Sequence, residues 1–467
     1  MKSPRLIACI CAVTLLGACG QARMVKNTAI MRNKLIAGDW PGALATLRQG
    51  KKSKAYKEQD RVMYWMNEGM LLHLLAKYKA SEAVLERAEK RSEELFTTSI
   101  RKGIKAKFTS EAATDYQGED YEKVMLNVIK ALSYMESGDV SGALVEARKI
   151  NKKLAYFNTK YTRKNVYNQD AFAHWMAGLL YEIEHSYDDA RIAYAAAIKL
   201  YETDFAGRYH LQPPPYIYED LIRVATLNHD TDLLAKYKAK YGPKGATGET
   251  AQLLKTHGEI VVFHLNGEGP TKSDYFINCI FKNALQWYCD GRPGGEFIQR
   301  KTIRLTRPGY TAVKVAFPRL HLHPARAGHL TLTVGDARSQ SFPAEPINAI
   351  AATTFRDKTA RVFKNAIARA VTKALTQMAA GAVGKAAGGK TLGFLAKLTT
   401  SVVNQATEEA DKRTWTTLPA RIDIARAIVA PGVHAVHLRT ADGRSATIPN
   451  IKVEAGKRVF ITYRTIP

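Results

Sequence analysis

The residues with the clearest chemistry lie near the N-terminus, where a cysteine follows two small residues. Residues 16–19, Leu-Gly-Ala-Cys, match the bacterial lipobox pattern, and a basic start with Lys2 and Arg5 and a short apolar run precede them. This layout is typical of a secretory signal. The sequence therefore predicts a lipoprotein signal peptide over 1–18 and a Cys19 thiol that carries a diacylglycerol. The alternative is an ordinary signal peptide that contains a cysteine by chance.

Two further cysteines remain once the leader and the acylated cysteine are set aside. They are Cys279 and Cys289, ten positions apart. In an oxidising periplasm such a pair can form a disulfide, and we expect this one to do so. The alternative is two buried free thiols, because sequence does not show whether the sulfur atoms meet. Two cysteines are too few ligands for a metal, and no Cys-x-x-Cys occurs, so no metal site is predicted here.

A phosphate-loop pattern, GxxxxGK[ST], is matched in full by Gly384, Gly389, Lys390 and Thr391. In such loops backbone amides hold phosphates, the lysine reaches them and the threonine holds Mg²⁺. The context here differs, because residues 366–378 read as an alanine-rich helix where a buried strand is required. We interpret the motif as a glycine-rich break between two helices and expect no cofactor. A nucleotide-binding enzyme is the remote alternative.

Histidines and acids give weaker signals. His321 and His323 lie two apart, near His329, but no Asp, Glu or Cys joins them locally, so we expect no metal ligation. The chain lacks GxSxG and HExxH motifs. We therefore expect no catalytic residues and no enzyme activity.

The charge of the chain points to anionic partners. Its formal net charge is +26, and 46% of its residues are hydrophobic, which is enough for sizeable cores. An exported protein meets envelope glycans and lipid headgroups rather than nucleic acid. The basic residues are spread along the chain, so solubility alone is the alternative explanation. No second stretch is long and apolar enough for a transmembrane helix, and one acylated cysteine can tether a soluble body.

The first half reads as helical repeats. From about residue 24 to 250 apolar residues recur at helical spacing. A small–large pattern typical of tetratricopeptide repeats, whose period is roughly 34 residues, returns at unequal intervals. The copies are Gly178, Tyr181, Tyr187, Ala190, Tyr194 and Ala197; Gly69, Leu72, Tyr78, Ser81, Leu85 and Ala88; Ala131, Tyr134, Gly138, Val140, Ala143, Ala147 and Ile150; and the fragment Gly38, Asp39, Trp40, Ala43 and Leu47. We predict an irregular repeat domain over 19–250, with a generic helix bundle as the alternative. Stacked repeats form a concave surface that binds proteins.

The second half alternates with period two, which indicates strands. They are expected at Ile260–Leu265, Thr302–Leu305, Ala312–Phe317, Leu330–Val334, Ile422–Val429, Val433–Arg439, Ser445–Val453 and Arg458–Arg464. The predicted fold class is α+β and multidomain. The repeats precede an antiparallel β-sandwich-like domain in two parts, 258–346 and 413–467, with a helical insertion over 347–412. Two separate small β domains are the alternative. Residues 370–403 of the insertion could contact a membrane or a partner, or pack against the sheet.

Several segments together resemble one family. They are 115–122, 143–148, 267–272, 411–415 and 418–420, combined with the lipobox. Their order resembles a poorly characterised family of bacterial envelope lipoproteins with tetratricopeptide-like N-terminal halves. The resemblance implies export, an acylated N-terminus and a scaffold-like body, and it implies no known reaction and no catalytic residues.

The sequence as a whole predicts a non-enzymatic interaction scaffold of the cell envelope. Gly20 rather than Asp follows Cys19, which favours the outer membrane, with the body facing the periplasm. The expected partners are an envelope protein on the repeats, the membrane through the lipid anchor, and an anionic glycan or lipid. The alternative is a glycan- or peptidoglycan-associated accessory factor of envelope biogenesis.

Overall fold

The computed structural model describes residues 22–102, 114–160, 167–281, 287–289, 311–359, 368, 372 and 410–466. The expected leader, Cys19, the strand at Thr302–Leu305 and the motif at 384–391 lie outside these residues. Of the predicted insertion, the structure describes a helix over 347–359, residues 368 and 372, and the non-helical residues 410–412. Within the described part of the chain, no helix has the length and apolar character to cross a membrane.

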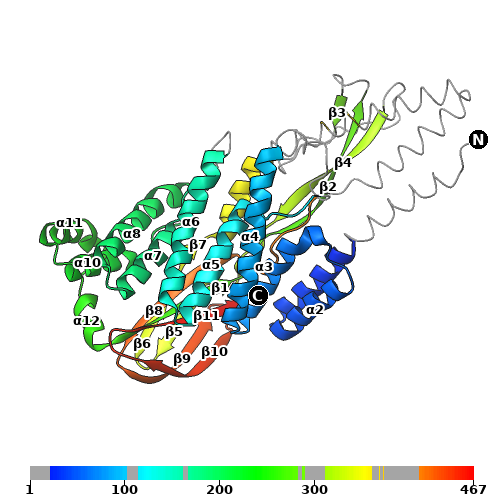
Figure 1. Ribbon diagram of the computed structural model, residues 1–467. Helices are drawn as coiled ribbons and strands as arrows, with labels where there is room; N and C mark the ends of the chain where they lie inside the picture. The colour runs from blue at the N-terminus through cyan, green and yellow to red at the C-terminus, as the bar shows by residue number, and fades with distance from the viewer. Residues whose placement is uncertain are drawn as a thin grey trace, which may run out of the picture.

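The first half is a series of antiparallel helix pairs (Figure 1). The pairs are a helix over 22–36 with α2 (Trp40–Lys52), α3 (Arg61–Leu74) with α4 (Tyr78–Lys102), α5 (Asp120–Glu136) with α6 (Val140–Lys160), α7 (Ala171–Ile183) with α8 (Tyr187–Leu200), and α10 (Tyr216–Leu227) with α11 (Thr231–Tyr241). Shorter helical turns are η1 (Glu58–Asp60), η4 (Tyr201–Phe205), α9 (Ala206–Tyr209), η5 (Gly242–Lys244) and α12 (Thr250–Thr256).

Small residues let the paired helices approach closely. A Cβ atom placed on Gly178 would lie 2.6 Å from Cδ1 of Tyr194, and one on Gly69 would lie 2.4 Å from Cδ2 of Leu85. Both contacts join the two helices of one pair, at positions that the repeat pattern predicts. Aromatic and leucine side chains thus fill the space that the missing side chain leaves.

The second half contains three sheets (Figure 1). The strands are β1 (Gly258–Asn266), β2 (Thr271–Phe281), β3 (Trp287–Cys289), β4 (Thr311–His321), β5 (Leu330–Val334), β6 (Ala337–Gln340), β7 (Phe342–Glu345), β8 (Arg421–Val429), β9 (Gly432–Thr440), β10 (Ser445–Val453) and β11 (Arg458–Thr465). We call the sheet of order β11-β1-β8-β7 the core sheet and that of order β10-β9-β5-β6 the outer sheet. The sheet of order β3-β2-β4 is the arm, which extends away from the body.

One strand pair corrects the prediction of an antiparallel sandwich. β1 and β11 run parallel, with Glu259 opposite Arg458 and Val262 opposite Ile461, whereas the other pairs among the described strands are antiparallel. Parallel neighbours require a crossover connection, which the whole chain between β1 and β11 supplies here. Period-two alternation marks a strand but carries no information about its direction.

The core sheet is buried on both faces, and every residue of β1 is buried. On one face Ile260 and Val262 share an apolar cluster with Leu332 and Leu438 of the outer sheet. On the other face Phe263 belongs to the cluster that includes the cores of the helices. The body therefore has three layers: helices, core sheet and outer sheet (Figure 1).

Candidate functional site

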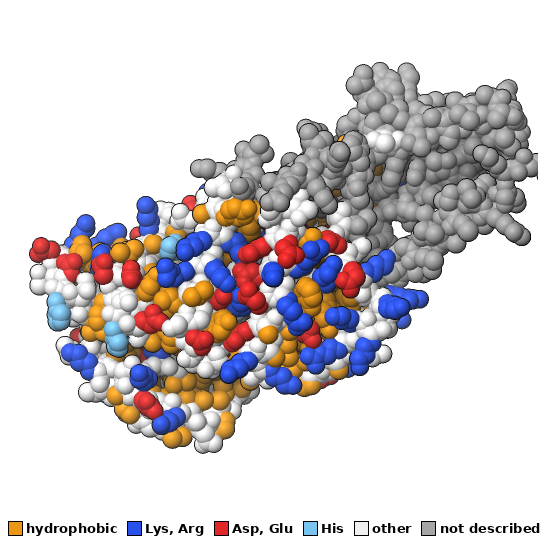
Figure 2. All heavy atoms as spheres, in the orientation of Figure 1, with side chains coloured by type: hydrophobic (Ala, Val, Ile, Leu, Met, Phe, Trp, Pro, Cys, Tyr) orange, Lys and Arg blue, Asp and Glu red, His pale blue; other side chains and the backbone are white. Residues whose placement is uncertain are grey.

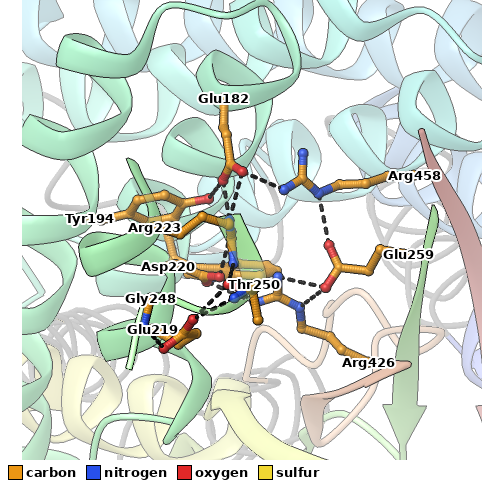
Figure 3. Close-up of polar contacts among 11 residues, drawn as sticks. Glu182, Tyr194, Glu219, Asp220, Arg223, Gly248, Thr250, Glu259, Arg426 and Arg458 are labelled. Carbon is orange, nitrogen blue, oxygen red and sulfur yellow. Dashed lines mark hydrogen bonds and ion pairs between the residues drawn. The ribbon is translucent and has the colours of Figure 1, made fainter. Parts of the chain in front are cut away.

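Within the described part of the chain, an extensive group of buried charges lies where α7 and α10 meet the core sheet (Figure 3). Its side chains are at most 8% exposed and come from both halves of the chain. They are Glu182 on α7, Asp220 and Arg223 on α10, Glu259 on β1, Arg426 on β8 and Arg458 on β11. We call this set the junction network.

Arg223 forms the helical side of the junction network. Its Nε and Nη2 donate to the two carboxylate oxygens of Glu182 at 2.8 Å each, and Nη2 also lies 2.7 Å from Oδ1 of Asp220. The hydroxyl of Tyr194 donates to Glu182 at 3.0 Å, and the indole Nε1 of Trp175 donates to Asp220 at 3.0 Å. A bidentate pair of this kind fixes both the distance and the angle between its helices.

Two arginines of the core sheet complete the junction network. Arg458 donates to Glu182 at 2.6 Å and to Glu259 at 2.8 Å. Arg426 donates to Glu259 at 2.8 Å and to both carboxylate oxygens of Asp220 at 2.8 Å. Each arginine therefore bridges a helix and β1.

The junction network has three carboxylates and three guanidinium groups, so its charges balance. Burial opposes ionisation of Glu182, but Arg223 and Arg458 outweigh it and hold the pKa of Glu182 below its usual range. Burial likewise opposes ionisation of Glu259, but Arg426 and Arg458 outweigh it and lower the pKa of Glu259. These carboxylates stay ionised at neutral pH, so their chemistry is that of a structural interlock and not of a proton donor.

Glu219 extends the same region to the turn before α12. Its carboxylate accepts hydrogen bonds from the backbone N–H groups of Thr247 and Gly248 at 2.7 and 2.9 Å, and from the Thr250 hydroxyl at 2.6 Å. These bonds lower the pKa of Glu219 against the opposing effect of burial. The turn that leads into α12 is thereby fixed to α10 (Figure 3).

A hydroxyl, an imidazole and a carboxylate line up within the core sheet. Thr465 Oγ1 lies 2.6 Å from Nε2 of His264, and Nδ1 of His264 lies 3.5 Å from Oδ2 of Asp423. This order of groups is the one that nucleophilic catalysis requires. However, all three residues are at most 3% exposed, so a substrate carbonyl has no access to the hydroxyl. Asn266 donates to Asp423 at 2.9 Å, and the group serves as a polar core at the end of the sandwich.

A second buried histidine lies between the helices and β11. His73 Nδ1 lies 2.9 Å from the Ser133 hydroxyl, and Nε2 lies 3.2 Å from that of Thr462. Burial lowers the pKa of His73 to about 4. The imidazole is therefore neutral at physiological pH and links two helices to the last strand.

One acidic cluster has the geometry of a cation site. Oxygen atoms of Glu86, Glu89 and Glu146 lie within 4.8 Å of one another. Lys130 Nζ lies 2.8 Å from Glu89 and 3.0 Å from Glu146, and Lys153 Nζ lies 2.6 Å from Glu89. These ammonium groups already supply the positive charge that a metal would bring.

The arm contains the residues of two sequence predictions. Cys279 is disulfide-bonded, and it lies directly opposite Cys289 in the register of β2 and β3. His321 Nε2 lies 2.6 Å from the Ser273 hydroxyl. His323 Nε2 contacts the Thr271 hydroxyl at 2.9 Å in the same way. Each histidine thus contacts a hydroxyl of β2.

The repeat surface that faces inward is covered by the protein itself. We call α3, α5, α7 and α10 the inner helix layer, because all four contact the core sheet or the segment 410–420. His73 of α3 contacts Thr462, Glu122 of α5 accepts from the backbone N–H of Trp415 at 2.8 Å, and Trp175 of α7 packs against Phe263. The expected partner surface on this side is therefore occupied by the core sheet.

The outer helix layer, α4, α6, α8 and α11, remains exposed. Among its described side chains, three large apolar ones are exposed: Val145 by 52%, Tyr156 by 42% and Ile192 by 53%. Figure 2 shows apolar side chains among acidic and basic ones over this side of the molecule. The sequence does not distinguish the inner helix layer from the outer one, because both carry the same repeat pattern.

Comparisons with known proteins give no family. No protein-family profile matches the chain, and no curated protein matches it. Among solved structures, the apo form of RapI is similar over 50% of this chain and 59% of its own, at 13% identity and a TM-score of 0.37. MamA AMB-1 is similar over 50% of this chain and 97% of its own, at 14% identity and a TM-score of 0.31. The chain thus spans about 59% of RapI.

Proposed function

We propose that this protein is a non-enzymatic lipoprotein of the bacterial outer membrane that faces the periplasm and holds a protein partner on its outer helix layer. The observation that carries the proposal is the division of the repeat surface. The inner helix layer is closed by the core sheet, and the outer helix layer exposes Val145, Tyr156 and Ile192.

The lipobox supports an anchored position for this surface. The described body begins with a helix at residue 22, only three positions after Cys19. Three residues span at most about 10 Å of extended chain. An acylated Cys19 therefore holds the start of the helical half close to the membrane, and the attached body is presented to the periplasm.

The composition of the outer helix layer fits a protein partner. Val145, Arg148, Lys152 and Tyr156 recur at helical spacing on α6, and each is exposed. Ile192 adds an exposed apolar side chain on α8. Apolar anchors within a charged rim are the usual anatomy of a protein interface.

In-cell crosslinking tests the partner surface. A photo-reactive residue is placed at exposed position 148 or 152 of α6, and captured proteins are identified by mass spectrometry. We expect one envelope protein at both positions, and we expect V145D together with I192D to abolish its capture. The control is Leu253→Asp on α12, where an equally apolar and 41% exposed side chain lies outside the outer helix layer. Capture that persists in the double variant contradicts the proposal.

Membrane fractionation tests the anchor separately. Wild-type protein is expected in the outer-membrane fraction and a Cys19→Ala variant outside it, because the variant has no thiol to acylate. A Cys19→Ala protein that still fractionates with the outer membrane would show that the tether lies elsewhere.

A further inference from the structure

The outer sheet has one face that no described layer covers. Leu330, Leu332 and Val334 of β5 and Val436 and Leu438 of β9 point towards the core sheet and are buried. Because side chains alternate along a strand, the residues between them point the other way. That second face lies opposite the helices, on the far side of the molecule from the outer helix layer.

The strand register arranges this face into two rows. In the first row Thr331 lies opposite Gln340 on one side and Arg439 on the other, and Arg439 lies opposite Ser445. The row therefore crosses the four strands β6, β5, β9 and β10.

The second row runs beside the first, two residues further along each strand. Thr333 lies opposite Arg338 and His437, and His437 lies opposite Thr447. Each row crosses three gaps between strands, a length of about 14 Å at roughly 4.8 Å per gap. We call the two rows together the polar face.

The polar face carries basic and neutral polar side chains. Its eight residues comprise two arginines, one histidine and five neutral hydrogen-bonding side chains, and none is acidic or apolar. Within the described part of the chain neither Arg338 nor Arg439 forms an ion pair, in contrast to the arginines of the junction network. The nearest acids along the chain lie in turns, and Asp442 is bound by Arg444 at 3.2 Å.

We propose that the polar face binds an anionic polysaccharide. The free guanidinium groups of Arg338 and Arg439 match carboxylate groups, and the threonine, serine and glutamine side chains match sugar hydroxyls. A lipid-binding surface would need several apolar side chains that enter the bilayer. The two rows contain none, and the same side of β9 adds one large apolar side chain beside them, Val433, which is 67% exposed. A protein interface would need a cluster of apolar or aromatic anchors, which a single valine does not form.

This inference goes beyond the proposed function, because it assigns a ligand to the opposite layer of the molecule. A protein partner on the outer helix layer and a polysaccharide on the polar face could be held at the same time. At the proposed periplasmic location, a chain of net charge +26 would meet such polysaccharides in the envelope.

Binding of the purified full mature chain to polygalacturonate, a carboxylated polysaccharide, tests the proposal. The comparison probes are neutral dextran and vesicles that contain phosphatidylglycerol. We expect binding to polygalacturonate that weakens with salt, and at least tenfold weaker binding to dextran and to the vesicles. We expect the R338Q/R439Q double variant to lose at least tenfold in affinity for polygalacturonate.

The matched control is the double variant R444Q/K452Q, which removes the same charge from exposed neighbouring positions that are paired with acids. It should keep wild-type affinity, and circular dichroism should show both double variants to be folded. Wild-type affinity in R338Q/R439Q, equal loss in both double variants, or tighter binding to vesicles than to polygalacturonate would each overturn the proposal. The V145D variant should keep polysaccharide binding, so failure here is distinct from failure of the partner surface.

Discussion

The two faces of the core sheet hold their neighbours by different means, although the same strands build both. Towards the outer sheet the strands present small and branched apolar residues such as Val262, Ala425 and Ile461. Towards the helices they present Phe263 together with Arg426 and Arg458 of the junction network.

The difference shows how the chain fixes the position of its helical half. Apolar burial stabilises a contact but tolerates small shifts, since it depends mainly on the area removed from water. Buried ion pairs add little net stability, but they permit only one arrangement, because removing either partner leaves an unpaired buried charge. The apolar face thus contributes stability, and the charged face sets which helix meets which strand.

The largest expected effect is from breaking the charged face. Arg223→Ala leaves Glu182 and Asp220 without their shared partner, and we expect the free energy of unfolding to fall by about 3–5 kcal/mol. Urea unfolding measures the change. The control Arg191→Ala removes an exposed pair with Asp188 and should cost less than about 1 kcal/mol. Similar losses in both variants would contradict the role of the junction network.

Truncation on the apolar face gives the next effect. Leu332 is fully buried between the two sheets, and Leu332→Ala should lower the free energy of unfolding by about 2–5 kcal/mol through lost burial and a residual cavity. Unlike Arg223→Ala, it should leave the position of the helices unchanged. Cysteine crosslinks or distance labels placed across the helix–sheet contact measure the position of the helices. A shift of the helices in Leu332→Ala would contradict the different roles of the two faces.

A histidine on the helix-facing side of the core sheet should make the free energy of unfolding depend on pH. Burial lowers the pKa of His73 to about 4, below the value of about 6.5 in an unfolded chain. The unfolded chain therefore binds this proton first, and stability is lost as pH falls from about 6.5 to 4. His73→Gln should remove about 2–3 kcal/mol of that loss, measured by urea unfolding across this range. A difference in stability between wild type and His73→Gln that does not change with pH would refute the assignment.

The smallest expected loss of stability comes from disturbing the close packing within a helix pair. Gly178→Ala places a Cβ 2.6 Å from the ring of Tyr194, and the free energy of unfolding should fall by about 1–3 kcal/mol. Gly207→Ala is the matched control, because nothing lies within 4 Å of its added Cβ and its helical backbone favours alanine. In thermal unfolding, Gly178→Ala should have a lower melting temperature than wild type. Gly207→Ala should have an unchanged or higher one.

Local sequence patterns predicted much of the fold. The strands Leu330–Val334 and Ser445–Val453 have the predicted bounds, and the small–large contact of Gly178 with Tyr194 is present. Strand β2 was missed because its sequence mixes Lys272 and Asp274 with apolar residues and shows no clean alternation. The parallel pairing of β1 with β11 has no local signal, since it depends on residues about 200 positions apart.

The junction network was also missed, for a related physical reason. Charged residues on an amphipathic helix read as solvated, and the partners of Glu182 lie 41 and 276 positions away. One signal was available, because Arg426 has the same strand phase as the apolar Ile422 and Ile424. A charge in the apolar phase of a strand indicates a buried partner. The acylation of Cys19 and the role of residues 384–391 remain predictions of the sequence.

Native-state hydrogen exchange of the full chain tests the central claim, that the core sheet closes the inner helix layer and makes one cooperative body. We expect the amides of α7 and of β1 to open with the same free energy, the highest in the protein. We also expect Arg426→Ala, which removes a guanidinium bound to both α10 and β1, to lower the opening free energies of α7 and β1 by equal amounts. Strands that stay protected while the helices open at a separate, lower free energy would contradict this claim.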